Sequence, residues 1–306
     1  MSFKQVLEAI EVLSSATVDG REVARLLADR GITGVETEHV ETKATATDFV
    51  SCVVPGTNPD LPALGVIGRL GGIGARPEVV GMVSDADGAT VALATALKLA
   101  DMAKAGDPLP GPVRIHTHVC THAETRPNHP VRLMRSPLPA RSMMQREVHP
   151  AMAAILSVDS TRGNRFVNKR GVALTPVVKE GWLLRVPDGM LDLIGWVSGE
   201  LPLVMPLVTQ DITPQENGLW HLNSIAQPST ATNAPMMGVA LTAQTTVPGC
   251  ATGVNNAGDL DIATRFCIEV AKRFAVGACP FFDQAEFDEI TARYGSLRHL
   301  QSMGNA

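Results

Sequence analysis

Aromatic side chains are scarce in this 306-residue chain: Phe, Trp and Tyr make up 4% of it, with one tyrosine. The core must therefore be built mainly from aliphatic side chains. Five cysteines, an odd and scattered number, argue against a disulfide-stabilised domain. Basic residues are not in excess, since the formal net charge is -5, and this excludes the positive surface that nucleic acid requires.

Long hydrophobic runs are also missing. No stretch approaches the roughly 18 apolar residues of a membrane span, and the start, MSFKQVLEAIEVL, lacks the basic region and cleavage site of a signal peptide. Hydrophobic residues make up 45% and charged residues 19%, as in soluble globular proteins. We expect a soluble cytoplasmic protein that binds neither nucleic acid nor membranes.

The chain alternates between strand-like and helix-like segments. Strands are expected at residues 63–70, 154–159, 202–208 and 237–243, and strand pairs at 35–54 and 170–186. Helices are expected at 3–13, 19–31, 89–104, 187–198 and 259–274. Several strands are apolar on both faces, which predicts an α/β fold: a three-layer α/β/α sandwich around a mixed, mostly parallel sheet. Without a repeat or linker, residues 1–306 are predicted to form one domain that begins with a helical pair over 1–31.

One segment, VRIHTHVCTHAETRPNHPVRLMRS over residues 113–136, holds four of the eight histidines. Its beginning is typical of a buried strand, in which alternation puts His116, His118 and Cys120 on one face. Imidazole, thiolate and carboxylate groups bind zinc and transfer protons. The spacing matches no defined zinc signature, so hydrogen bonding within the core is the alternative for these histidines.

Polar residues follow the expected ends of several strands, at the edge where ligands bind in open α/β sheets. They are Arg69, Glu124, Asp159, Asp211 and Thr252. Glu124 is a candidate general base or a surface glutamate, and Asp159 is a candidate metal ligand or a solvated turn residue. The polar, turn-rich segment 209–223, which contains Asp211 and His221, is a candidate pocket wall.

Two further groups have both a chemical and a structural interpretation. Asp85 and Asp87 precede the helix expected at 89–104, where they either supply oxygen ligands to a metal or cap the helix. Cys120 and Cys250 are candidate nucleophiles, although a free buried cysteine usually acts as a small hydrophobic residue.

The order of these motifs resembles the co-catalytic zinc aminopeptidase and deacylase superfamily, which has a three-layer α/β/α fold. SDADGATVALATALKLA resembles the turn that carries a metal-bridging aspartate, here Asp85. THAET resembles the strand end with the general base, here Glu124, and AILSVD the strand end with a later aspartate ligand, here Asp159. The N-terminal VLEAIEVLSSATVDGREVARLL resembles that family's first helical pair.

The chain departs from that pattern at both terminal histidine ligands. GVIGRLGGIG has Arg69 where the superfamily has a His-x-Asp motif, and VPGCATG has Thr252 near its last histidine. The short segment between Arg69 and Asp85 leaves no room for the lid or dimerisation domain that many relatives insert. A two-zinc site on the plan of that superfamily is therefore not expected.

The whole chain also resembles an uncharacterised bacterial family of unassigned activity. The resemblance is carried by THVC, SPL, ILSVDSTRGNR, VVKEG, TQDIT, LNSIAQPSTAT and VPGCATG. It implies a shared fold and site but no reaction.

These features predict a hydrolase of C–N bonds in a small peptide or acylated amino acid. Asp85 and Asp159 with His122 (or His118 in its place) would hold one zinc, manganese or cobalt ion per chain. Glu124 and His118 are the expected catalytic residues, and the substrate-binding residues are expected to be Arg69, Asp211, His221 and Thr252.

Two alternatives stay open. One is a metal-free, non-catalytic protein that binds a peptide or amino acid or serves as an assembly subunit, and the other is thiol chemistry at Cys120 or Cys250. In each case we expect a small-molecule or short-peptide ligand and a homo-oligomer.

Overall fold

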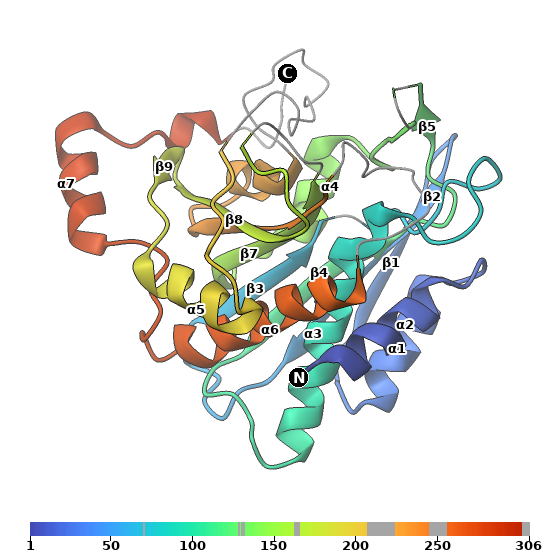
Figure 1. Cartoon of the computed structure of the whole chain (residues 1–306), viewed down its shortest axis with the longest axis horizontal. Coiled ribbons are helices and arrows are strands. Elements are labelled where there is room, and N and C mark those ends of the chain that lie inside the picture. The colour runs from blue at the N-terminus through green and yellow to red at the C-terminus, as the bar shows by residue number, and fades with distance from the viewer. Residues whose placement is uncertain are drawn as a thin grey trace.

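The computed structural model describes residues 1–69, 71–127, 129, 132–161, 166–206, 224–244 and 256–301. An eight-stranded sheet with the order β1-β2-β4-β3-β7-β10-β8-β9 runs through this part of the chain (Figure 1). Its strands are β1 (Glu36–Glu41), β2 (Ala46–Val54), β3 (Ala63–Gly68), β4 (Val113–Val119), β7 (Met152–Thr161), β8 (Gly171–Lys179), β9 (Trp182–Leu184) and β10 (Met236–Thr242). A separate short hairpin pairs β5 (Thr125–Arg126) with β6 (Leu133–Met134).

The four central strands, β4, β3, β7 and β10, are parallel, while the outer strands pair antiparallel at both ends. All six residues of β3 are buried, and so are all seven of β10. Strands covered on both faces read as continuous apolar runs, which is why ALGVIG and MMGVALT show no alternation. The mixed sheet predicted from the sequence is confirmed.

Helices cover both faces of the sheet. On one face the large apolar core includes α1 (Phe3–Leu13), α2 (Gly20–Asp29), α3 (Asp87–Lys104), α5 (Asp188–Ser198) and α6 (Ala257–Phe274). In Figure 1, α3 and α6 lie in front of the sheet, and α1 and α2 lie toward β1. On the other face, α4 (Ala140–Glu147) and the 3-10 helix η2 (Ser224–Thr230) pack on two smaller clusters. These layers confirm the predicted α/β/α sandwich.

Three further helical elements complete the described chain: α7 (Gln284–Tyr294) and the 3-10 helices η1 (Ser84–Ala86) and η3 (Arg298–Leu300). Of the helices in the described ranges, none combines the length and the apolar character needed to cross a membrane.

Among the longer elements, the sequence-based prediction differs from the structure at one strand and two helices. Residues 202–206 form no extended strand, and Val204 makes only an isolated bridge to Leu174. Pro202 and Pro206 lack the backbone N–H that a central strand must donate, while 207 and 208 lie outside the described residues. Helices α4 and α7 were not predicted.

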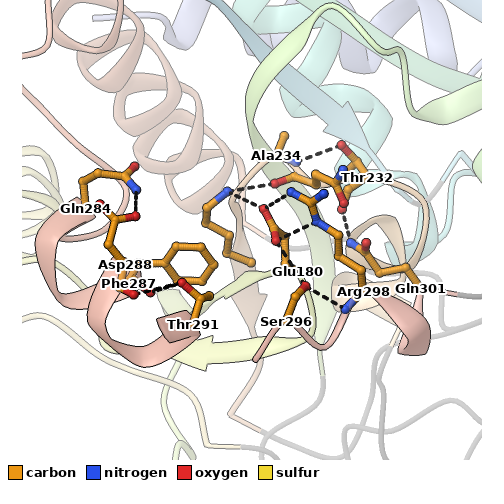
Figure 2. Close-up of polar contacts among 12 residues, drawn as sticks. Glu180, Thr232, Ala234, Gln284, Phe287, Asp288, Thr291, Ser296, Arg298 and Gln301 are labelled. Carbon is orange, nitrogen blue, oxygen red and sulfur yellow. Dashed lines mark hydrogen bonds and ion pairs between the residues drawn. The ribbon is translucent and has the colours of Figure 1, made fainter. Parts of the chain in front are cut away.

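The C-terminal segment is attached to the sheet through Glu180, which lies in the turn between β8 and β9 (Figure 2). Its carboxylate accepts two hydrogen bonds from the Arg298 guanidinium, at 2.7 and 2.9 Å. The Gln301 amide donates to the carbonyl oxygens of Ser229, at 3.2 Å, and Thr232. The C-terminal segment therefore contacts η2, which lies over the ends of the central strands.

A glycine at the end of β3 lets α3 begin close to the sheet. A Cβ atom on Gly68 would lie 2.5 Å from the Gly88 carbonyl oxygen and 2.8 Å from Thr117 Oγ1. No side chain fits at that separation, so the close approach of α3 to the strand end depends on Gly68.

We expect Gly68→Ala to lower the free energy of unfolding by about 1–3 kcal/mol, since the added methyl group must displace backbone atoms. The matched control is Gly189→Ala on the exposed side of α5, where a Cβ meets nothing within 4 Å. There alanine should raise stability by up to about 1 kcal/mol, because glycine weakens helices. Urea denaturation of both variants measures the difference, and equal effects would contradict the close contact at Gly68.

Candidate active site

Three central strands bring polar side chains together on the face covered by α4 and η2. Arg69 directly follows β3, His118 lies near the end of β4, and Asp159 lies in β7. Gly68 pairs with Val158, and the Arg69 backbone N–H donates to the Val158 carbonyl at 2.9 Å. Because neighbouring parallel strands end at the same edge, residues far apart in sequence become neighbours here.

The Arg69 side chain is 6% exposed, and each of its three nitrogen atoms donates a hydrogen bond within the protein. Nε donates to the Ser224 carbonyl at 3.0 Å, Nη2 donates to Gln227 Oε1 at 2.6 Å, and Nη1 donates to Glu147 Oε2. Arg69 is thus fixed by contacts from both η2 and α4.

Glu147 is the last residue of α4 and is fully buried. One carboxylate oxygen accepts from Arg69, and the other lies 3.7 Å from His118 Nδ1. The His118 ring packs against Phe49, with the ring centroids 5.7 Å apart. Glu147 was not predicted as a site residue, although its spacing from Met143 and Met144 places it on the buried face of α4.

Asp159 and Asp85 supply two more carboxylates. Asp159 is 1% exposed and accepts a hydrogen bond from Ser224 Oγ at 2.6 Å. Asp85 is half-buried in η1, and its pKa is raised by the charge of Asp159 in addition to burial. The N-cap of α3 is Ala86, without a side-chain hydrogen bond, so Asp85 does not cap this helix.

Burial is the main cause of the shifted pKa values in this cluster. It raises the pKa of Asp85 to about 7, of Glu147 to about 7 and of Asp159 to about 6, because low-polarity surroundings disfavour the charged carboxylate. The positive charge of Arg69 acts in the opposite direction and lowers the pKa of Glu147 and Asp159. Burial, and then the charge of Arg69, lowers the pKa of His118 to about 3, so its ring is neutral near pH 7.

Three buried polar atoms of this cluster have no hydrogen-bond partner among the described residues. They are Glu147 Oε1, Asp159 Oδ1 and His118 Nδ1. Buried polar atoms are normally paired, so unpaired ones mark a place for a water molecule or a polar ligand group. The cluster can therefore accept a hydrogen-bonding ligand and exchange protons with it near neutral pH.

The remaining predicted residues lie elsewhere. Glu124 is exposed and pairs with Arg135 at 3.3 Å, and His122 is exposed with its Nδ1 2.9 Å from Thr121 Oγ1.

The buried Cys120 thiol contacts Thr45 Oγ1 at 3.4 Å, and burial raises its pKa, which disfavours the nucleophilic thiolate. The predicted residues outside the described ranges are Asp211, His221, Cys250 and Thr252.

A metal ion does not fit the described residues as they are arranged. No group of three or more His, Cys, Asp or Glu side chains in the described ranges converges closely enough to hold one. Asp85, Asp159 and His122 do not form the expected ligand set. The Arg69 guanidinium instead lies directly against Glu147 within the carboxylate cluster.

A protein-family model, described as "Protein of unknown function (DUF1177)", matches residues 38–304. A search of curated protein sequences gives no significant match. The sequence evidence therefore indicates a family but no reaction.

Several solved structures share this fold at low sequence identity. The bottromycin maturation enzyme BotP in complex with Mn is 14% identical with a TM-score of 0.52, over 90% of this chain and 71% of BotP. A Caenorhabditis elegans leucine aminopeptidase is 12% identical with a TM-score of 0.50, over 87% of this chain and 64% of the aminopeptidase. An Acidobacteriales bacterium glutaminyl cyclase is 11% identical with a TM-score of 0.50, over 90% of this chain and 94% of the cyclase. They confirm the aminopeptidase-like fold expected from the sequence motifs.

The raised pKa of Asp159 predicts a pH-dependent stability. In the folded state this carboxyl keeps its proton up to about pH 6, above the value of 3.8 for a free side chain. The stability that the folded state gains by holding this proton is therefore fully present below about pH 4, and it is lost as the pH rises through about 6. Asparagine does not ionise, so the free energy of unfolding of Asp159→Asn should fall less than that of the wild type between pH 4 and pH 6. The difference should be on the order of 1–3 kcal/mol.

Urea denaturation at steps of pH measures this difference. The exposed Asp107→Asn variant is the matched control and should run parallel to the wild type. A slope for Asp159→Asn that equals that of the wild type would show that Asp159 ionises as an ordinary carboxyl.

Proposed function

Since the chain belongs to the DUF1177 family, whose function is unknown, we propose from its own residues that it hydrolyses a C–N bond in a small peptide or acylated amino acid. The proposed site consists of four buried residues, Arg69, His118, Glu147 and Asp159, and the half-buried Asp85. It lies at the strand ends where open α/β folds bind ligands.

The observation that carries this proposal is the set of carboxyl groups with a pKa between about 6 and about 7, of which Glu147 is paired with the Arg69 guanidinium. A catalytic acid or base works best when its pKa lies near the operating pH. With these pKa values, protonated and ionised carboxyl groups are both populated in the site near pH 7. Amide hydrolysis needs both, a base for the attacking water and an acid for the leaving amine.

Glu147 is proposed as the general base. Its free oxygen, Oε1, is buried, unpaired within the described residues and close to His118 Nδ1, so it can accept a proton from a bound water. The protonated form of Asp85 or Asp159 would then donate to the amine nitrogen as the C–N bond breaks. Arg69, attached to Glu147, would stabilise the negative charge that develops during the attack.

The role of Glu124 as base, inferred from the motif order, competes with this assignment. Glu124 is 47% exposed and paired with an equally exposed arginine, whereas Glu147 is fully buried. The expectation of a cytoplasmic homo-oligomer with a small-molecule or short-peptide ligand is retained in the proposal. No step of the reaction is assigned to a metal ion.

The second candidate function is non-catalytic binding of a peptide or amino acid on the same scaffold. It is favoured by the three hydrogen bonds that Arg69 makes within the protein, one from each nitrogen, because they hold the guanidinium in a structural role. In that case the unpaired buried atoms would bind a ligand's polar groups without a change in its covalent bonds.

We expect Glu147→Gln to lower kcat by about 10²–10⁴-fold, the usual contribution of a general base. Mass spectrometry of a mixture of dipeptides and N-acyl amino acids, incubated with each variant, measures turnover. Circular dichroism confirms that the variant is folded, and Glu124→Gln in the same assay should keep the wild-type rate.

The reverse pattern, with Glu124→Gln inactive and Glu147→Gln active, would contradict the assignment of the base. Binding of a compound from the mixture without cleavage by the wild type would favour the non-catalytic alternative.

A further inference from the structure

The buried cluster contains more carboxyl groups than positive charges. Among the described residues, the charge of one guanidinium, Arg69, acts on Glu147 and Asp159, while Asp85 lies within reach of the charge of Asp159. His118 is neutral near pH 7. Burying an unpaired carboxylate is costly, so such a site must contain a cation or hold protons. Carboxylate and imidazole side chains are the ligand types that divalent metal ions such as Mn²⁺ and Zn²⁺ prefer.

The position of Arg69 is set by the backbone as well as by its side-chain contacts. Its N–H continues the pairing of β3 with β7, and its guanidinium donates to η2 and α4. The planar guanidinium offers several donors in a fixed geometry, which suits it to bind a carboxylate and neighbouring oxygens at the same time. The guanidinium already contacts the Glu147 carboxylate in the folded structure.

A divalent ion and this guanidinium would compete for the same oxygens. An ion bound to Glu147 would either displace Nη1 or lie close to a second positive charge, and both are unfavourable. The described residues also contain no converging set of three metal-binding side chains.

We propose that the guanidinium of Arg69 is the permanent cation of this site and takes the place of a divalent metal ion. It supplies the positive charge that the carboxylates of Glu147 and Asp159 require, and it does so as part of the folded chain. This inference concerns the same residues as the proposed hydrolase, but it does not depend on a reaction and is tested without a substrate.

Removal of the guanidinium should open a cation site. Wild-type protein should contain far less than one equivalent of transition metal by elemental analysis, and Mn²⁺, Zn²⁺ and Co²⁺ should leave its Tm unchanged. Arg69→Ala should have a lower Tm, and guanidinium ion or Mn²⁺ should raise it by about 5 °C or more at a concentration roughly a hundredfold above Kd. Arg185→Ala, which removes an arginine that is 71% exposed, is the matched control and should show neither change.

The double variant Arg69→Ala/Glu147→Gln keeps the test decisive if the single variant does not fold. Loss of both charges leaves fewer uncompensated carboxylates, so the double variant should melt at a higher temperature than Arg69→Ala or fold where that variant does not.

Wild-type protein that holds about one metal ion per chain, and loses it in Asp159→Asn, would overturn the proposal. A Tm of Arg69→Ala that neither guanidinium nor any of the metals restores would overturn it as well. These measurements are separate from turnover, so the failure of the hydrolase assay leaves their result intact.

Discussion

The buried contact between Arg69 and Glu147 is the interaction on which the arrangement of the strand ends depends. Both side chains are withdrawn from water, at 6% and 0% exposure. Breaking a buried pair by removing one partner typically costs about 3–5 kcal/mol, because the other charge is left uncompensated. The contact joins the end of β3 to α4, so the layer that covers this face of the sheet is held at the strand ends by charge as well as by apolar packing.

Support for this contact extends to the C-terminus of the described chain. Helix η2 accepts from Arg69 through Ser224 and Gln227, and Gln301 donates to the Ser229 carbonyl at the other end of η2. Arg298 binds Glu180 in the β8–β9 turn, as Figure 2 shows. The C-terminal segment therefore stabilises the helix that positions the site, although it lies outside the sheet.

Part of the cluster is predictable from the sequence and part is not. Arg69, His118 and Asp159 lie at the ends of apolar runs, and the rule that parallel strands present their ends at one edge brings them together. Asp85 is recognisable from its place before a strong helix. Glu147 follows no strand, and only the helical periodicity of RSMMQREV could have identified it, as a carboxylate on the same face as two buried methionines. Glu124 shows the opposite case, since a position after a strand does not ensure burial when the chain turns outward into a hairpin.

The contrast between fold and site follows from the same physics. Sheet order, strand direction and the two helical layers depend on apolar burial, which many sequences satisfy, so 14% identity to BotP is compatible with a shared architecture. The charge balance at the strand ends depends on single side chains. Because Arg69 supplies a positive charge, this cluster needs no bound metal ion to balance the carboxylates of Glu147 and Asp159. The proposed reaction therefore rests on the charges and proton affinities of these side chains, whereas the shared fold indicates only the edge of the sheet at which they lie.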